Sequence, residues 1–174
     1  MDNSFFTYLQ QLELMAFFTG YPLIYAVTLF IAGNLQSKNN FKNRIVSLLP
    51  FTYALVGTLY LGLQLKNLYP DYSIENIKQT MQQPWLIIWG LLSIFFWIPA
   101  IGKKPVLSLL HSLVFFFLLV RDLAMHFFQS SADKSVVRND MKIYTDSLLL
   151  NLGAFTLVVL LSLLFPRNKN RLRS

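Results

Sequence analysis

The residues best suited to chemistry lie within one apolar stretch of this sequence, residues 106–128. His111, Arg121, Asp122 and His126 are its charged or titratable side chains. At about 100° per residue, His111, Asp122 and His126 project within roughly 60° of one another on a helix. Asp122 and His126 are four residues apart and can meet directly, which suits proton relay or pH sensing. Arg121 lies beside this row and is suited to hold an anionic headgroup or a carboxylate.

Three further polar residues are expected near this row. Asp146 begins the last apolar stretch, Asn151 follows at a depth similar to that of Arg121, and Glu13 precedes the first stretch. Burying Arg or Asp in hydrocarbon costs roughly 2.5–3.5 kcal/mol each, so both side chains should face the bundle interior. We predict one polar cluster, which either binds a ligand, relays protons or is an ion-pair knot that orients the helices. Its predicted members are His111, Arg121, Asp122, His126, Asp146, Asn151 and Glu13.

No metal, cofactor or catalytic site is predicted. His111 and His126 lie about 22 Å apart along one helix, so they cannot bind one ion within a chain. The sequence lacks a P-loop, a His-Glu-x-x-His motif and a G-x-S-x-G motif. The absence of cysteine excludes a disulfide scaffold, a thiolate zinc site, an iron–sulfur cluster and a cysteine nucleophile.

The composition is that of a membrane protein. The 174 residues are 55% hydrophobic and only 13% charged, whereas a soluble domain is nearer one quarter charged. The net charge of +7 arises from 15 Lys and Arg against 8 Asp and Glu. In a membrane protein such an excess indicates orientation and contact with anionic lipid, and we expect no nucleic-acid partner.

Five apolar stretches are long enough to cross a bilayer, which needs about 20 residues of helix. They are residues 14–35, 45–65, 84–102, 106–128 and 146–166. The intervening segments are all too short to fold as a separate domain. We therefore predict an all-α integral membrane protein, with residues 1–174 forming a single domain of five transmembrane helices.

The distribution of charge predicts the orientation of this bundle. One side receives nine cations and no acid, and the other receives five cations with nearly all of the acids. The positive-inside rule then places the N-terminus outside and the C-terminus in the cytoplasm. A bacterial inner membrane is the predicted location, with the mitochondrial inner membrane as the alternative. The nine cations are Lys38, Lys42, Arg44, Lys103, Lys104, Arg167, Lys169, Arg171 and Arg173.

Three local features predict how the helices are shaped and joined. Pro22 and Pro50 fall inside the first two stretches and should kink them. Residues 102–105 should form a tight turn between two antiparallel helices. Residues 74–81, preceded by Ser73 as a helix cap, should form a short amphipathic helix at the outer surface.

A row of small residues in the second stretch predicts close helix packing. Ala54, Thr58 and Gly62 are spaced by four and would form a ridge that lets a neighbouring helix approach. Packing within the chain is the preferred interpretation, and a dimer interface would use the same ridge.

Three functions are compatible with these features. The leading hypothesis is a non-enzymatic subunit or accessory component of a larger membrane complex. One alternative is a small transporter or proton-linked channel that uses the polar row of residues 106–128. The second alternative is a membrane-embedded lipid-modifying enzyme. The expected partners are the bilayer, anionic lipid near the basic tail at 167–173, and other membrane subunits or a second copy.

Overall fold

The computed structural model describes residues 3–34, 39–81, 83–128 and 134–164, with side chains at 10–33, 43–78, 81, 83–125 and 141–164. The regular elements of the described residues are all helices, and α8 and α9 are the longest. In chain order they are α1 (Asn3–Phe18), α2 (Tyr21–Asn34), α3 (Asn39–Val46), α4 (Leu49–Leu68), α5 (Ile74–Thr80), α6 (Pro84–Leu91), the 3₁₀ helix η1 (Leu92–Trp97), α7 (Pro99–Gly102), α8 (Pro105–Phe128) and α9 (Lys134–Leu164).

Within the described residues, four helical segments are long and apolar enough to cross a membrane. They are Gln10–Gly33, Asn43–Leu68, Pro105–Met125 and Met141–Leu164. The predicted third stretch, residues 84–102, is divided into α6, η1 and α7, and its apolar helix Pro84–Trp97 is shorter than the other four.

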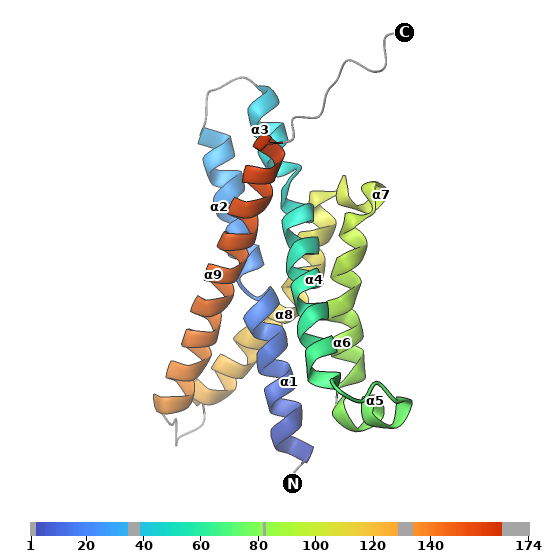
Figure 1. Cartoon of the computed structure of the whole chain (residues 1–174). Coiled ribbons are helices and arrows are strands. Elements are labelled where there is room, and N and C mark those ends of the chain that lie inside the picture. The colour runs from blue at the N-terminus through green and yellow to red at the C-terminus, as the bar shows by residue number, and fades with distance from the viewer. Residues whose placement is uncertain (1–2, 35–38, 82, 129–133, 165–174) are drawn as a thin grey trace.

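The helices form a bundle in which α1 lies at the centre of one end (Figure 1). Helix α1 packs against α4 and α6 on one side and against α8 and α9 on the other. Helices α1 and α2 follow each other as one broken column, and α4 packs along η1. The beginning of α1 and the end of α9 lie at opposite ends of the bundle (Figure 1).

Prolines begin helices in this structure, and the kinks predicted at Pro22 and Pro50 take the form of breaks, because the spans Gln10–Gly33 and Asn43–Leu68 are interrupted just before each proline. Each is the second residue of its helix, in α2 and α4 respectively, and the preceding helix has already ended. Pro84, Pro99 and Pro105 are the first residues of α6, α7 and α8. The first turn of a helix leaves its N–H groups unbonded, so proline fits there without the loss of a hydrogen bond.

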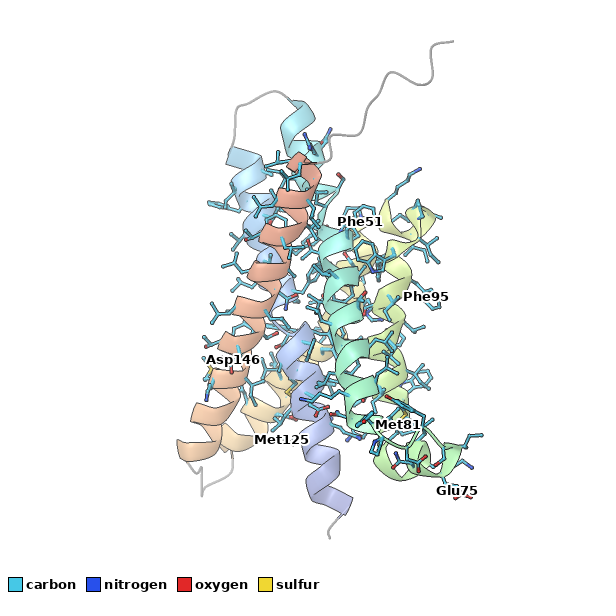
Figure 2. All side chains as sticks on the ribbon, viewed as in Figure 1. Phe51, Glu75, Met81, Phe95, Met125 and Asp146 are labelled. Carbon is cyan, nitrogen blue, oxygen red and sulfur yellow. The ribbon has the colours of Figure 1, made fainter. Side chains whose placement is uncertain are left out.

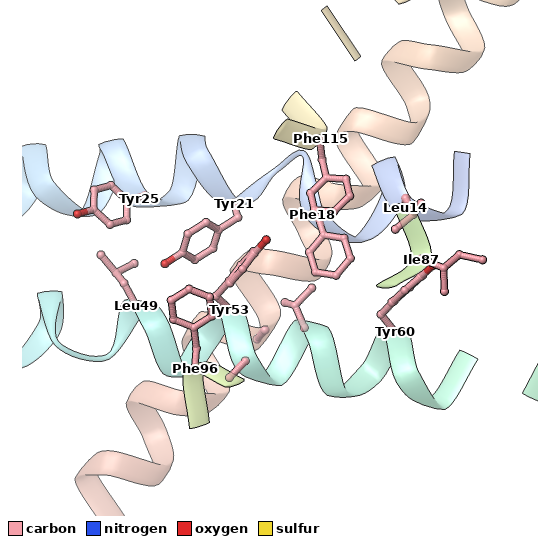
Figure 3. Close-up of a cluster of buried hydrophobic side chains, with 13 residues drawn as sticks. Leu14, Phe18, Tyr21, Tyr25, Leu49, Tyr53, Tyr60, Ile87, Phe96 and Phe115 are labelled. Carbon is pink, nitrogen blue, oxygen red and sulfur yellow. The ribbon is translucent and has the colours of Figure 1, made fainter. Parts of the chain in front are cut away.

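Aromatic side chains fill the centre of the bundle and join four elements (Figure 3). The Phe18 ring stacks on Phe115 of α8, with ring centroids 4.7 Å apart. It also meets the rings of Tyr53 and Tyr60 of α4 edge-on, at 5.6 and 5.4 Å. Phe96 of η1 completes the contact from the far side of Tyr53. These close ring pairs are worth about 0.5–1.5 kcal/mol each beyond the area they bury.

Helix α4 approaches η1 closely at Gly57, and the predicted ridge of Ala54, Thr58 and Gly62 is wrong in part. Ala54 is buried, but Thr58 and Gly62 are exposed, and a Cβ at Gly62 would meet nothing within 4 Å. A Cβ at Gly57 would lie 1.9 Å from the Ser93 hydroxyl of η1. The spacing of four resembles a helix face, but the buried row here is shifted by one residue.

Two predicted connections are confirmed. Ser73 caps α5, because its hydroxyl accepts a hydrogen bond from the Asn76 backbone N–H at 3.2 Å. Helices α7 and α8 are joined by Lys103 and Lys104 alone, which makes them a tight hairpin.

Candidate functional site

Among the described residues, Asp122 of α8 is the buried charged group of the predicted cluster. Its side chain is only 12% exposed. One carboxylate oxygen accepts from the Arg121 guanidinium, with Nη2 at 3.0 Å and Nε at 3.2 Å. The other oxygen accepts from the Gln11 amide of α1 at 2.6 Å. Asp122 therefore ties α8 to α1.

Arg121 does not face the bundle interior, which corrects the prediction made for it. Its side chain is 56% exposed, although it remains bonded to Asp122. Neighbouring residues on a helix point about 100° apart, so only one member of the Arg121–Asp122 pair can face inward. The arginine satisfies the buried carboxylate from the outer side of the helix.

Three successive polar positions of α1 bond to three different elements at this end of the bundle. Glu13 accepts from the side-chain amides of Gln64 and Asn67 of α4, at 3.3–3.4 Å. Gln10 accepts from the backbone N–H of Gln83, just before α6, at 3.2 Å. We call these residues, together with Gln11 and Asp122, the polar belt: Gln10, Gln11, Glu13, Gln64, Asn67, Gln83 and Asp122.

Sequence reasoning missed most of the polar belt because it followed charge. Four of its members are neutral: Gln10, Gln11, Gln64 and Gln83. Gln64 lies inside the apolar stretch 45–65, whose bounds were set by charged residues alone. The run Gln10-Gln11-Leu12-Glu13 at the start of an apolar stretch is the signal that was available. Amides buried among apolar helices need partners, so such a run indicates contacts to neighbouring helices.

Asn151 lies far from Arg121 and instead supports the break between α1 and α2. Its amide donates to the carbonyl oxygens of Phe17 and Ser147, both at 2.8 Å. The Ser147 hydroxyl accepts from the Gly20 backbone N–H at 2.9 Å. Two backbone groups freed by the break are thereby bonded to side chains of α9. We call Gly20, Ser147 and Asn151 the break latch.

The depth predicted for Asn151 is wrong because α9 begins earlier than its apolar stretch. The helix starts at Lys134 and not near Asp146, so it is 31 residues long. Phe116 of α8 lies beside Tyr144 of α9, with ring centroids 6.4 Å apart. In antiparallel helices this register places Asn151 about twelve residues, or 18 Å, above Arg121.

His111 is enclosed by aromatic rings and does not contact Asp122. Its ring stacks on Trp89 with centroids 4.8 Å apart and planes at 3°, and Nδ1 shares a 2.7 Å hydrogen bond with the Tyr53 hydroxyl. Its Nε2 atom is buried with no hydrogen-bond partner among the described residues. The His126 side chain lies outside the described residues, so its predicted contact with Asp122 stays a prediction.

Asp146 contacts none of the other predicted members that the structure describes. It is exposed in the lower half of α9 (Figure 2), inside the segment Met141–Leu164. It makes no hydrogen bond or ion pair with any residue that the structure describes. The predicted single cluster is therefore distributed over the polar belt, the break latch, the aromatic enclosure of His111 and the exposed Asp146.

The described residues contain no group of three or more His, Cys, Asp or Glu side chains placed to hold a metal ion. Comparisons with protein-family models, with curated proteins and with solved structures gave no match.

Proposed function

We propose that this protein is a non-enzymatic subunit or accessory component of a larger membrane complex, and that it acts through helix–helix contact in the bilayer. The observation that carries the proposal is the exposed Asp146 carboxylate on α9. In the segment Met141–Leu164 only 17% is buried within the chain, the lowest share of the four candidate spans. A carboxylate on such a surface lacks the partner that an intramembrane charge needs.

The interior supports the same proposal because its polar groups serve mainly to join helices. Asp122 and Glu13 join α1 to α8 and α4, and Asn151 joins α9 to α1. The aromatic rings of Phe18, Tyr53 and Phe115 fill the space between them. Each of these contacts fixes the position of a helix, and the outer surface remains for a partner.

The proposal includes five membrane passes. The divided segment α6–η1 rises about 24 Å along its axis, because the 3₁₀ stretch advances about 2.0 Å per residue. That length covers most of a hydrocarbon layer about 30 Å thick. Helix α7 turns back on η1, where a Cβ at Gly102 would lie 2.6 Å from the Phe96 carbonyl oxygen. Five passes also agree with the opposite positions of the first and last helix ends in Figure 1.

We place the N-terminus outside and the C-terminus in the cytoplasm of a bacterial inner membrane. The exposed cations Arg44, Lys103 and Lys104 lie at the end where α9 finishes, whereas Glu75 lies at the opposite end (Figure 2). We expect anionic lipid at the basic end. The basic tail at 167–173, assigned to the same side, lies outside the described residues.

Photo-crosslinking in the native membrane tests the proposal. A photoreactive phenylalanine analogue in place of Leu149, which is 64% exposed on α9, should give a discrete adduct with another membrane protein. The same analogue in place of Leu59, which is 46% exposed on α4, is the matched control and should contact lipid. Lipid adducts alone from both positions would contradict a subunit role.

The second candidate function, a small transporter or proton-linked channel, is favoured by the break between α1 and α2. Discontinuous membrane helices often form substrate or ion sites, and Asn151 Oδ1 is buried there with no partner among the described residues. This function predicts a proton or ion flux in liposomes that Asn151→Leu abolishes. Absence of flux from the unaltered protein would exclude it.

A further inference from the structure

Helix α9 carries a continuous row of exposed residues on the side that faces away from the bundle. The row follows alternate steps of four and three residues, which is the spacing along which two helices pack at a shallow crossing angle. We call it the outer seam. It consists of Lys142, Asp146, Leu149, Gly153, Thr156, Leu160 and Leu163, all exposed.

The middle of the outer seam leaves room for another helix. A Cβ at Gly153 would meet nothing within 4 Å. The Thr156 hydroxyl donates to the Leu152 carbonyl at 2.9 Å, so its polar group is satisfied within the helix. Small residues at a membrane interface let two backbones approach closely, which strengthens their packing.

The lower part of the outer seam carries an unpaired carboxylate. Asp146 lies about five residues inside the segment Met141–Leu164 and has no bonded partner among the described residues. Lys142 lies one turn before it, in the less favourable order for a helical ion pair, and the structure shows no ion pair between them. No described cation of this chain pairs with Asp146, which leaves its carboxylate open to a cation of another molecule.

A second copy packed along the same seam brings a carboxylate, not a cation, to the depth of Asp146, because its own Lys142 lies one turn lower. In a two-fold dimer whose axis is normal to the membrane, equivalent residues share one depth, so two Asp146 carboxylates would face each other and repel. Arg121 is the exposed cation of α8, but the contact between Phe116 and Tyr144 places it about seven residues, or 10 Å, below Asp146.

Building on the proposed function, we infer that the outer seam docks a transmembrane helix of a different protein, with a lysine or arginine facing Asp146. The basic residue neutralises the carboxylate within the bilayer. The partner backbone approaches most closely at Gly153, one heptad further along. The partner is therefore a membrane chain with one intramembrane cation.

A reconstituted binding experiment tests this inference. Because the chain has no cysteine, Lys103→Cys gives a single donor label at the exposed α7–α8 turn. The probe is a leucine-rich transmembrane peptide of about 24 residues with one lysine about five residues inside its apolar stretch. Energy transfer in liposomes should show that this peptide binds, and that a matched all-leucine peptide binds much more weakly.

Variants of two residues define the contact. Asp146→Asn should weaken binding of the lysine peptide roughly tenfold, the upper range for one polar contact between membrane helices. Asp146→Lys should lose the lysine peptide and gain a matched glutamate peptide. Gly153→Leu should block binding, whereas Gly62→Leu is the matched control, because Gly62 also has open space but lies on α4.

Equal binding of the lysine and leucine peptides, or binding unaffected by Asp146→Asn, would overturn the inference. Energy transfer between labelled copies of the protein that Gly153→Leu abolishes would overturn it in favour of a dimer. If the peptides fail while Leu149 still crosslinks a protein in the native membrane, the subunit role stands and the basic-helix partner is wrong. Unchanged thermal unfolding of each variant excludes misfolding as the cause.

Discussion

The two long sides of α9 differ in polarity, and the difference is the opposite of that found in a helix of a soluble protein. The side that faces the bundle carries Ser147, Asn151, Ala154 and Val158, all buried. The side that faces away is the outer seam, whose upper end consists of Leu160 and Leu163. In water the polar side chains would face outward, whereas here they face the neighbouring helices.

This difference shows what holds the helices together. Lipid is as apolar as leucine, so burying leucine gains little in a bilayer, and helices associate through close packing and hydrogen bonds. Ser147 and Asn151 are small and polar, and they meet backbone groups that the break between α1 and α2 leaves unbonded. The outer seam keeps one unpaired carboxylate, that of Asp146, and this residue marks the proposed partner site.

Substitutions of two glycines test this comparison, and the one at Gly20 should have the largest effect on stability. A Cβ at Gly20 would lie 2.6 Å from the backbone of Ser147 and Leu148 on the inner side of α9. Because both neighbours are backbone atoms, they cannot move aside as a side chain would. We expect Gly20→Ala to reduce the free energy of unfolding by about 3 kcal/mol, measured by denaturation in mixed micelles.

Gly153→Ala is the control on the opposite side of the same helix. Its Cβ would enter open space, so stability should stay within about 0.5 kcal/mol or rise slightly, since alanine favours a helix. Equal effects of the two substitutions would show that α9 does not approach the break as described.

Asn151→Leu should sharpen the comparison with an intermediate effect. The substitution keeps much of the side-chain volume but removes the hydrogen bonds to the Phe17 and Ser147 carbonyl groups. Since Phe17 then loses its partner at the break, we expect a loss of about 1–2 kcal/mol in the same assay. Leu152→Asn, which places an amide on the exposed side, should change stability much less, and the reverse order would contradict the inner role of Asn151.

Much of the fold follows from the sequence, because the length of an apolar stretch and the residues that cap a helix or form a turn are local signals. The helical class, the short α5 helix behind Ser73 and the turn at Lys103 and Lys104 were all predicted, and the structure contains them. The start of α9 was not predicted, because the charged residues after Lys134 continue the helix beyond the apolar stretch. Hydropathy finds the part of a helix in lipid and does not report where the helix begins.

Less of the candidate site could be predicted from the sequence, because its contacts join segments that are far apart along the chain. Asp122 was expected to face the interior and does, but its partner Gln11 is 111 positions away and carries no charge. His111 shared a helix face with Asp122, yet the aromatic rings of Trp89 and Tyr53 enclose it at another depth. Periodicity predicts which side of a helix a residue occupies, and only packing decides what it meets there.

Ser147→Ala should have the smallest effect on stability among these inner-side substitutions, and the effect should still exceed that of a matched substitution on the outer seam. The substitution removes the acceptor for the Gly20 backbone N–H, which leaves one donor of the break unbonded. Interhelical hydrogen bonds in membranes average about 0.6 kcal/mol, so a loss of that size is expected. Thr156→Ala on the outer seam removes only a bond to its own helix and should lose less stability.

Amide hydrogen exchange at Gly20 provides the sharper measurement, because it should accelerate in Ser147→Ala and stay unchanged in Thr156→Ala. Equal exchange in both variants would mean that Ser147 does not protect the break.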